Sequence, residues 1–572
     1  MRRLVVLALL LGCRPPPVAA EPEPATTLTI LAVNDFHGGL YEAPLADQPD
    51  QAVGGLPWLA GAVDAVRQED PDLLLLDGGD MFQGSWPVNA TQGMGSVRAM
   101  NLLGLDAAAV GNHEFDYGPL ADGDPENRRG ALEAAAREAE FTWLSANLFT
   151  EGGARWSPEG IAPWTLLERK GLRIGVVGLS TVTTPQTTLL ENVEDLDFRE
   201  GVQAVEEILP EVREAEPDVM VLVAHLTGRC EPAGYLQLGE PCTPGDEIGA
   251  LLTELPRGTF DVMVLGHTHT LMAHRVDDTF LLQNRSQGHV LGRVDLVVGP
   301  EGVDHDASTI HPPWAMVHAP VDPGCEEGEY DLSPQELDGR TVTPSAEALD
   351  LVRSLEEEAG SLCDPVGCAA RVLERSREAE SEVGNLLSDA IAWAFPDADF
   401  ALQNSGGLRA NLPEGTLRRE HLQAVMPFDN RVVVVELTGA QVQKLLRIGS
   451  SGAQGIMQVA GARFHFDPSI TTGSDLDGDG EVSAWERDRL CDLTVGGAPV
   501  DPEETYRVAT SDFLYGGGDH LGPAFEGAPI LEEGPLLREI LFAYVEEQEE
   551  CLGAAGPLVD EAAPRIVVGP CP

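Results

Sequence analysis

Lysine is almost absent from this chain of 572 residues, and positive charge of any kind is scarce. Only Lys170 and Lys444 are lysines, and 36 basic residues stand against 94 acidic ones, which gives a formal net charge of −58. A nucleic-acid polymer is bound through clustered basic side chains, so this composition argues against DNA or RNA as a partner. The remaining positive charge is nearly all arginine, whose planar fork suits phosphate and carboxylate groups.

Long hydrophobic runs are also missing after the N-terminus. The run "LVVLALLLG", residues 4–12, follows a basic "MRR" start in the order of an export signal, and it is too short to span a membrane. Residues 10–13, "LLGC", resemble a bacterial lipobox, which makes Cys13 the lipidated first residue; ordinary cleavage after "VAA", residues 18–20, is the less favoured alternative. We therefore predict a signal peptide over 1–12 and a tether over 13–26. The mature protein is expected at the periplasm or cell surface, with a lipid anchor at Cys13 to the outer membrane as its membrane attachment.

No pair of cysteines has the CxxC spacing, which argues against a zinc site built from thiolates. Eight cysteines remain after Cys13, and an even number in an exported chain indicates disulfides. The sequence leaves their pairing open. Short loops favour Cys230–Cys242 and Cys363–Cys368, and less strongly Cys551–Cys571.

Six short apolar runs recur in the first half of the chain, with helix-like segments between several of them. Near-continuous apolar runs indicate strands that are covered on both faces, as in layered α/β folds. The runs are "TLTILAV" (27–33), "PDLLLLD" (71–77), "DAAAV" (106–110), "LRIGVVGLS" (172–180), "PDVMVLVA" (217–224) and "FDVMVL" (260–265).

Five of these six runs stop at polar clusters. Ligand sites in α/β sheets gather beyond the carboxyl ends of strands, so we expect these side chains to meet. Two carboxylates, one amide and four imidazoles suit two divalent transition metals such as zinc or manganese, and one carboxylate can bridge both ions. A single histidine after a strand is usually structural, so the prediction rests on the whole set. Its members are Asp35, His37, Asp80, Asn112, His225, His267 and His269.

His113 and Asp116 belong to the same stretch, "VGNHEFDYG", residues 110–118. His113 directly follows Asn112 and is expected to stay unligated, free for proton transfer. Asp116, three residues later, is expected to orient the His113 ring. We predict these two residues to be catalytic.

The motifs "NDFHG", "GGD", "GNHEFDYG", "AHLTG" and "GHTH" occur in the order found in calcineurin-like metallophosphoesterases. With the motifs of its second half, the chain resembles the bacterial periplasmic and animal ecto-5′-nucleotidases. The resemblance implies a four-layer α/β catalytic domain over 27–318, a β-sandwich flanked by helices. It implies one metal at Asp35, His37, Asp80 and His269, and a second at Asp80, Asn112, His225 and His267.

A linker with one helix is expected over 319–362, since "SAEALDLVRSLEEEAG" has helical spacing after a serine cap. A smaller α/β substrate-binding domain is expected over 363–572. Its motifs "ESEVGNLLSDA", "QNSGGLRANLPEG", "MPFDN" and "SDFLYGGGDH" resemble those of the nucleotidase substrate domain. The family usually has Phe or Tyr where this chain has His520, the expected second stacking partner of the base. The implied substrate residues are Arg377, Asn404, Gly407, Arg409, Phe428 and His520.

Residues 475–486, "DLDGDGEVSAWE", fit a twelve-residue calcium loop. Because "DPSITTGS" before it reads as loop rather than helix, we expect one structural Ca²⁺ in an insertion rather than a sensor. An acidic surface loop without an ion is the alternative. The predicted ligands are Asp475, Asp477, Asp479, the Glu481 carbonyl, Ser483 and Glu486.

Together these features predict an exported enzyme that removes phosphate from nucleotides by metal-activated water, with a small-molecule nucleotide as its partner. Related activities stay open: a 2′,3′-cyclic-nucleotide phosphodiesterase/3′-nucleotidase, or a UDP-sugar or NAD hydrolase. A rival of another class is a calcium-stabilised surface binding protein without activity.

Overall fold

The computed structural model describes residues 25–45, 48–121, 123–228, 246–320, 330–337, 339–360, 362–428, 430–452, 455–476, 482–560 and 562–571. The predicted signal peptide, Cys13 and nearly all of the tether lie outside these ranges. Within them, no helix is both long and apolar enough to cross a bilayer.

The first domain is built on two stacked β-sheets, and all six predicted strands form. β1 (Thr26–Val33), β4 (Leu74–Asp77) and β5 (Ala107–Ala109) lie side by side and parallel in an eight-stranded sheet. β10 (Leu172–Ser180), β12 (Val219–His225) and β13 (Val262–Gly266) do the same in a six-stranded sheet. The inner faces of the two sheets share one buried apolar cluster, which explains the near-continuous apolar runs.

Further strands complete these sheets. The first sheet adds β6 (Thr142–Leu144), β8 (Ile161–Ala162), β16 (Val290–Gly299), β17 (Gly302–Ile310) and β18 (Trp314–Ala315). The second adds β9 (Trp164–Arg169), β14 (Leu271–Val276) and β15 (Thr279–Asn284).

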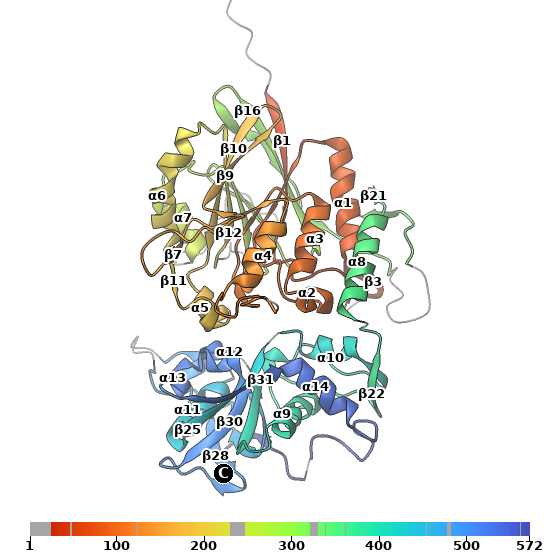
Figure 1. Ribbon diagram of the computed structural model, residues 1–572, viewed down its shortest axis with the longest axis vertical. Coiled ribbons are helices and arrows are strands. Elements are labelled where there is room, and N and C mark those ends of the chain that lie inside the picture. The colour runs from red at the N-terminus through yellow and green to blue at the C-terminus, as the bar shows by residue number, and fades with distance from the viewer. Residues whose placement is uncertain are drawn as a thin grey trace, which may run out of the picture.

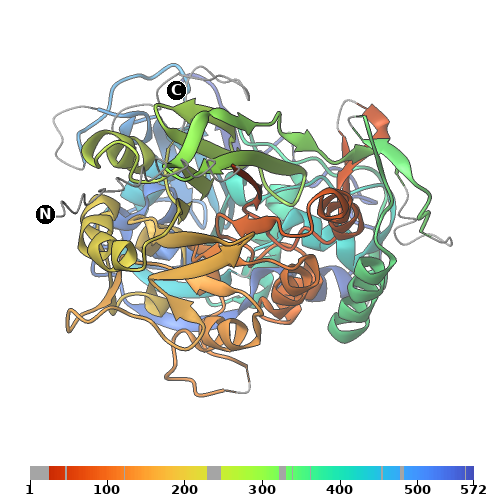
Figure 2. The same ribbon diagram turned by 90° about the horizontal axis from the view of Figure 1, so that it is seen from above.

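Helices cover both outer faces of the sandwich (Figures 1 and 2). The first sheet packs against α1 (Leu56–Glu69), α3 (Met94–Leu103), α4 (Gly130–Glu138) and α8 (Ala346–Ala359). The second packs against α6 (Gly201–Glu214) and α7 (Glu247–Glu254). The predicted four-layer α/β architecture is therefore confirmed.

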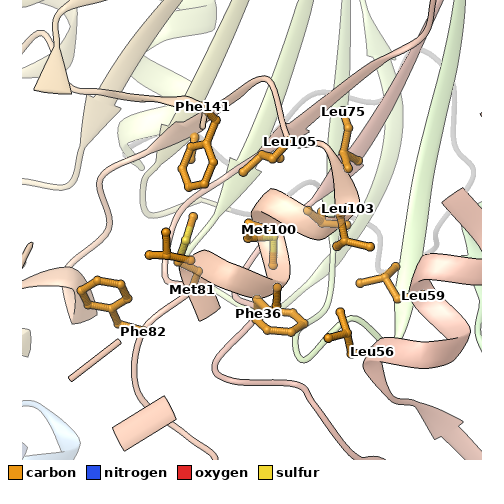
Figure 3. Packing of buried hydrophobic residues seen from close by; sticks show 14 of the residues in the cluster. Phe36, Leu56, Leu59, Leu75, Met81, Phe82, Met100, Leu103, Leu105 and Phe141 are labelled. Carbon is orange, nitrogen blue, oxygen red and sulfur yellow. The ribbon is translucent and has the colours of Figure 1, made fainter. Parts of the chain in front are cut away.

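The loops that carry the polar clusters are anchored by the apolar residues beside those clusters. Phe36 follows Asp35, and Met81 and Phe82 follow Asp80; all three apolar side chains are fully buried. Figure 3 shows them among side chains of the core beneath the helical layer. Burying these neighbours fixes where each loop runs, and the polar side chains are held in place with it.

The predicted linker helix is α8, and its Ser345 cap accepts a hydrogen bond from Ala348 N at 3.3 Å. Its buried residues Ala348, Val352 and Leu355 pack against the core under α1 and α3. The helix therefore belongs to the helical layer of the first domain, and the chain crosses to the second domain after it (Figure 1).

The second domain centres on a five-stranded sheet in the order β26 (Met457–Ala460), β23 (Phe400–Asn404), β30 (Thr505–Ser511), β25 (Arg431–Thr438) and β31 (Ile530–Leu536). α9 (Glu382–Ala394) and α14 (Leu537–Glu546) pack on one face, and α11 (Gly439–Gly449) packs on the other. The "EVGNLLSDA" part of the first substrate-domain motif lies in α9. A four-stranded sheet of β27 (Ala462–Phe466), β28 (Leu490–Val495), β29 (Ala498–Pro499) and β32 (Ile566–Val568) flanks this core.

Two disulfide predictions are wrong. Cys368 pairs with Cys551, and Cys491 pairs with Cys571, with Cα–Cα distances of 4.6 and 6.1 Å. Short loops favoured other partners, but β22 (Pro365–Ala369) lies beside the C-terminal segment, where Leu552 N donates to Cys368 O at 2.8 Å. Cys363 is also disulfide-bonded, though not to Cys368. The proposed Cys230–Cys242 pair lies outside the described residues.

Candidate active site

The carboxyl ends of five strands from both sheets meet at one edge of the sandwich. β1, β4 and β5 lead into Asp35, Asp80 and Asn112, respectively; β12 ends at His225, and β13 leads into His267 and His269. The structure thereby brings the seven predicted metal ligands together. Six of them, with His113, form three overlapping groups whose ligand atoms lie within 4.8 Å of one another: Asp35, His37 and His269; Asp80, His225 and His267; and His37, Asp80 and His113.

The first group contains Asp35, His37 and His269. His37 Nε2 lies 3.2 Å from His269 Nε2, and His269 Nε2 lies 3.3 Å from Asp35 Oδ1. Imidazole nitrogens that converge with a carboxylate oxygen in this way match the donor set of a borderline divalent cation.

The second group contains Asp80, His225 and His267. Asn112 joins it, because its Oδ1 lies 3.0 Å from His267 Nδ1 and 3.1 Å from His225 Nε2. Asp80 Oδ2 lies 2.9 Å from His225 Nε2 and 3.9 Å from His37 Nε2. One carboxylate therefore faces both groups, as a bridging ligand must.

Backbone carbonyls set the tautomers of two of these histidines. His37 Nδ1 lies 3.1 Å from Phe82 O, and His225 Nδ1 lies 3.0 Å from Gly78 O. A carbonyl can only accept, so each Nδ1 donates a proton and each Nε2 is the nitrogen that faces the site, where it would ligate a metal once deprotonated. The residues present thus fit a pair of divalent metal ions in donor chemistry and in the orientation of these two rings.

Several ligands have strained backbone conformations. Asp35, Asp80 and His267 have φ values of 49°, 61° and 85°, and His37 and His269 also lie in the left-handed region. Residues other than glycine adopt this region rarely, and such strain clusters at functional sites, where the surrounding packing enforces it. The buried Phe36, Met81 and Phe82 supply that packing.

Glu114 is a buried acceptor to which the sequence analysis gave no role. Its carboxylate accepts from the backbone N–H groups of Gly111 at 2.6 Å, Met81 at 2.8 Å, Asp80 at 3.0 Å and Phe82 at 3.1 Å. Burial, reinforced by the nearby Asp80 carboxylate, raises the pKa of Glu114 to about 7. Glu114 holds the turn that carries Asp80. The sequence shows that Glu114 lies in "GNHEFDYG", but it does not show which backbone N–H groups donate to the Glu114 carboxylate.

His113 and Asp116 form a close pair beside the metal ligands. They lie three residues apart around the short helix η1 (His113–Phe115), and His113 Nδ1 lies 2.6 Å from Asp116 Oδ2. Burial lowers the pKa of His113, but the carboxylates of Asp116 and Asp80 outweigh it and raise that pKa to about 10. Because Asp116 holds Nδ1, Nε2 is the ring nitrogen that stays available for proton transfer.

A cavity of about 250 Å³ joins this pair to the second domain. The two domains are in contact here: Asn89 Nδ2 donates to Pro427 O at 3.0 Å. Of the predicted substrate residues, five line the cavity. The residues that line it are Gln83, His113, Asp116, Thr187, Thr188, Leu189, Arg377, Asn404, Gly406, Gly407, Arg409, Phe428, Asn430, Phe513 and Asp519.

His520 does not face Phe428, which corrects the expected second stacking position. Its ring stacks on Trp485, with ring centres 4.9 Å apart and planes 8° apart, and it is not among the residues that line the cavity. His520 has a φ of 66° in the turn that follows residues 516–518, and its ring packs on Trp485 instead of facing the cavity. The aromatic residue that lines the cavity with Phe428 is Phe513, the third residue of the same "SDFLYGGGDH" motif, in the short helix α12 (Asp512–Tyr515).

Positive charge gathers at the second-domain side of the cavity. Burial, together with repulsion from Arg375 and Arg377, lowers the pKa of Arg409. The Arg409 guanidinium lies 5.8 Å from the centre of the Phe428 ring. Mutually repelling guanidinium groups at a cavity of a strongly acidic protein favour an anionic ligand.

Of the predicted calcium ligands, Asp477, Asp479 and Glu481 lie outside the described residues. Glu486 is buried, and its carboxylate accepts hydrogen bonds from Leu476 N and from Ser483 N. The two ends of the segment are therefore drawn together at the predicted closing residue.

Comparisons with known proteins agree with this geometry. Residues 28–271 match the calcineurin-like phosphoesterase family, which defines the first domain as a metallophosphoesterase that uses divalent metal ions. Residues 360–527 match the 5′-nucleotidase C-terminal domain. With both domains in this order, the chain belongs to the 5′-nucleotidase family and is a phosphohydrolase.

Relatives match over nearly the whole chain. A 5′-nucleotidase of Vibrio cholerae is 26% identical over 95% of this chain and 94% of its own length. A cell wall protein of Listeria monocytogenes is 26% identical over 97% of this chain and 71% of its own. The solved structure of a 5′-nucleotidase precursor from Thermus thermophilus shares the fold, with a TM-score of 0.66 and 24% identity over 96% of this chain and all of that one.

Proposed function

We propose that this protein is an exported, dinuclear-metal hydrolase that releases phosphate from nucleotides. The observation that carries the proposal is the cavity between the domains. It is lined at one end by His113 and Asp116, next to the metal ligands, and at the other by arginines and two phenylalanines. A nucleotide has the same order of parts: a phosphate, a sugar and a flat base.

Each group has a role in this proposal. Two divalent ions, when bound, supply an activated water as nucleophile and neutralise charge on the phosphate. His113 donates a proton toward the leaving oxygen, and Asp116 holds its ring. Arg377 and Arg409 bind anionic oxygens through charge-assisted hydrogen bonds, while Asn404 and the Gly407 backbone flank the ligand. Phe428 and Phe513 stack on the base.

The base platform can be tested separately from the chemistry. Phe428→Ala should lower kcat/KM for AMP by roughly 5- to 150-fold, because base–aromatic stacking contributes about 1–3 kcal/mol per base. Phe513→Ala should lower kcat/KM for AMP within the same range. p-Nitrophenyl phosphate has no base to place there, so both variants should hydrolyse it nearly as well as the wild type.

His520→Ala is the matched control, since the His520 ring lies outside the cavity. It should leave the ratio of the two activities unchanged. If Phe428→Ala lowered kcat/KM equally for AMP and for p-nitrophenyl phosphate, Phe428 would be a packing residue. The proposal that a nucleobase binds at this end of the cavity would then lose its support.

Export is supported by the basic and apolar N-terminus and by the similarity to a cell wall protein. The lipobox-like "LLGC" favours a lipid anchor at Cys13. The mass of the mature N-terminal peptide tests this directly: a lipidated residue 13 supports the anchor, and an unmodified start at residue 21 contradicts it.

We further propose that the insertion at 475–486 binds one Ca²⁺ as a structural clip. The register of its oxygen ligands supports this, as does the buried Glu486 at the closing position. A calcium-selective chelator should lower the melting temperature of the wild type, because a ligand bound only by the folded state stabilises it.

Glu486→Ala should lower the melting temperature by itself and abolish the effect of the chelator, because it removes the bidentate ligand. Glu504→Ala, outside the loop, should retain the full calcium response. Melting curves of the wild type that coincide with and without calcium would contradict the clip.

A further inference from the structure

A threonine-rich segment reaches the catalytic pair from outside the motifs considered so far. Residues 181–189, "TVTTPQTTL", leave the carboxyl end of β10 and form the short helix α5 (Thr184–Thr187). Thr187, Thr188 and Leu189 then line the cavity beside His113 and Asp116. Figure 1 shows α5 at the face of the first domain that meets the second.

The start of this segment is firmly anchored. Glu247, at the beginning of α7, accepts from Thr181 Oγ1 at 2.7 Å and from Val182 N at 3.0 Å. Its far end is tied to the metal site, because Asn112 Nδ2 donates to Thr187 O at 3.1 Å. The residue that follows is therefore held at a defined place.

That residue, Thr188, contacts Asp116 through its side chain. Thr188 Oγ1 lies 2.7 Å from Asp116 Oδ1, while His113 Nδ1 lies 2.6 Å from Asp116 Oδ2. An ionised carboxylate is acceptor-only, so both contacts donate to Asp116 and occupy one oxygen each. The Asp116 side chain is 9% exposed, which leaves water little room to replace a lost donor.

We propose that Thr188 is a positioning residue: its hydroxyl fixes the rotation of the Asp116 carboxylate and, through it, the direction of the His113 ring. The inference rests on the proposed role of His113 as proton donor. Thr188 acts here through Asp116 and not on the reacting atoms, so its loss should reduce kcat and leave KM nearly unchanged.

The proton-donor role makes the size of the effect depend on the leaving group. A nucleoside 5′-oxygen leaves poorly without a proton, whereas p-nitrophenolate leaves readily on its own. A misdirected His113 should therefore slow the hydrolysis of AMP more than that of p-nitrophenyl phosphate. A residue that merely supports the fold would slow both alike.

Thr188→Val keeps the shape of the side chain and removes the hydroxyl. It should lower kcat for AMP by about 10-fold, less than the roughly 10²–10⁴-fold contributed by a general acid, because His113 is still present. The loss on p-nitrophenyl phosphate should be smaller, and the metal content should not change. Thr188→Ser restores the donor and should recover most of the rate.

Thr183→Val is the matched control. It removes a hydroxyl from the same segment, where Thr183 Oγ1 lies 2.9 Å from Thr181 Oγ1 and makes no contact with Asp116. This variant should retain the wild-type kcat on both esters.

A double-mutant cycle gives the sharpest test. In an Asp116→Ala background Thr188 has no carboxylate to hold, so Thr188→Val should cause no further loss of kcat on either ester. The proposal would be overturned if the two substitutions reduced kcat independently, so that their fold-losses multiplied in the double variant. It would also be overturned if Thr188→Ser had a kcat no higher than that of Thr188→Val. A wild type active on the small ester but on no nucleotide would refute the nucleotide assignment, and the cycle on the small ester would still decide the role of Thr188. A wild type inactive on both would overturn both proposals.

Discussion

Asp80→Ala is expected to abolish phosphohydrolase activity and to leave fewer than two transition-metal ions per chain. The physical reason is that Asp80 Oδ2 faces His225 and His37 at once, so one substitution removes a ligand from both groups. The loss also leaves clustered histidines without the shared carboxylate, which weakens the affinity for both ions. Elemental analysis of the purified variant, alongside its activity, measures the effect.

Asp106→Asn is a matched control for that experiment. Asp106 is also a carboxylate of the first sheet, but it accepts from Leu75 N and pairs with Arg169 instead of facing the ligands. It should keep both ions and full activity. Two ions per chain in Asp80→Ala would reject the assignment of Asp80 as the bridge.

His113→Ala should show the opposite combination: both metal ions retained, with kcat reduced by about 10²–10⁴-fold, the range that general acid–base groups contribute. His113 lies beside the ligands but donates its Nδ1 proton to Asp116, whose carboxylate raises the pKa of His113. The comparison of kcat with metal content separates a proton donor from a ligand.

His311→Ala provides the control for removal of an imidazole. His311 follows β17 and pairs with Asp295 at 2.8 Å, outside the strand-end cluster. It should keep both metals and the wild-type kcat. If His113→Ala lost an ion, or if its kcat were unchanged, His113 would not be the proton donor.

The strands, and the meeting of the predicted ligand side chains at their ends, could be predicted from the sequence because the signals are local. A buried strand needs a short apolar run, and a side chain such as His225 or Asp80 stands out where such a run stops. Parallel strands carry their carboxyl ends to one edge of a sheet, so the pattern predicted that the polar side chains at these ends would meet. The sequence did not indicate which three strands belong to each sheet, because the strands of both sheets have the same apolar pattern.

Features that depend on contacts distant in sequence were missed. Cys368 pairs across 183 residues with Cys551, and nothing local distinguishes that partner from the nearer Cys363. Thr188 and Glu114 make hydrogen bonds to residues on other segments: Thr188 to Asp116, and Glu114 to the backbone of residues 80–82. The expected position of His520 was wrong because its ring stacks on Trp485, a contact that the order of residues does not indicate.

Phosphate release from a nucleoside 5′-monophosphate tests the central claim most directly. The purified protein is stripped of metal, then assayed on AMP with manganese, cobalt or zinc resupplied, beside 3′-AMP, a 2′,3′-cyclic nucleotide, UDP-glucose and NAD. The account predicts no release by the stripped protein, and metal-restored release from AMP that exceeds release from the other substrates. Metal-restored hydrolysis of another substrate with AMP left intact, or no release from any nucleotide with any of these metals, would contradict it.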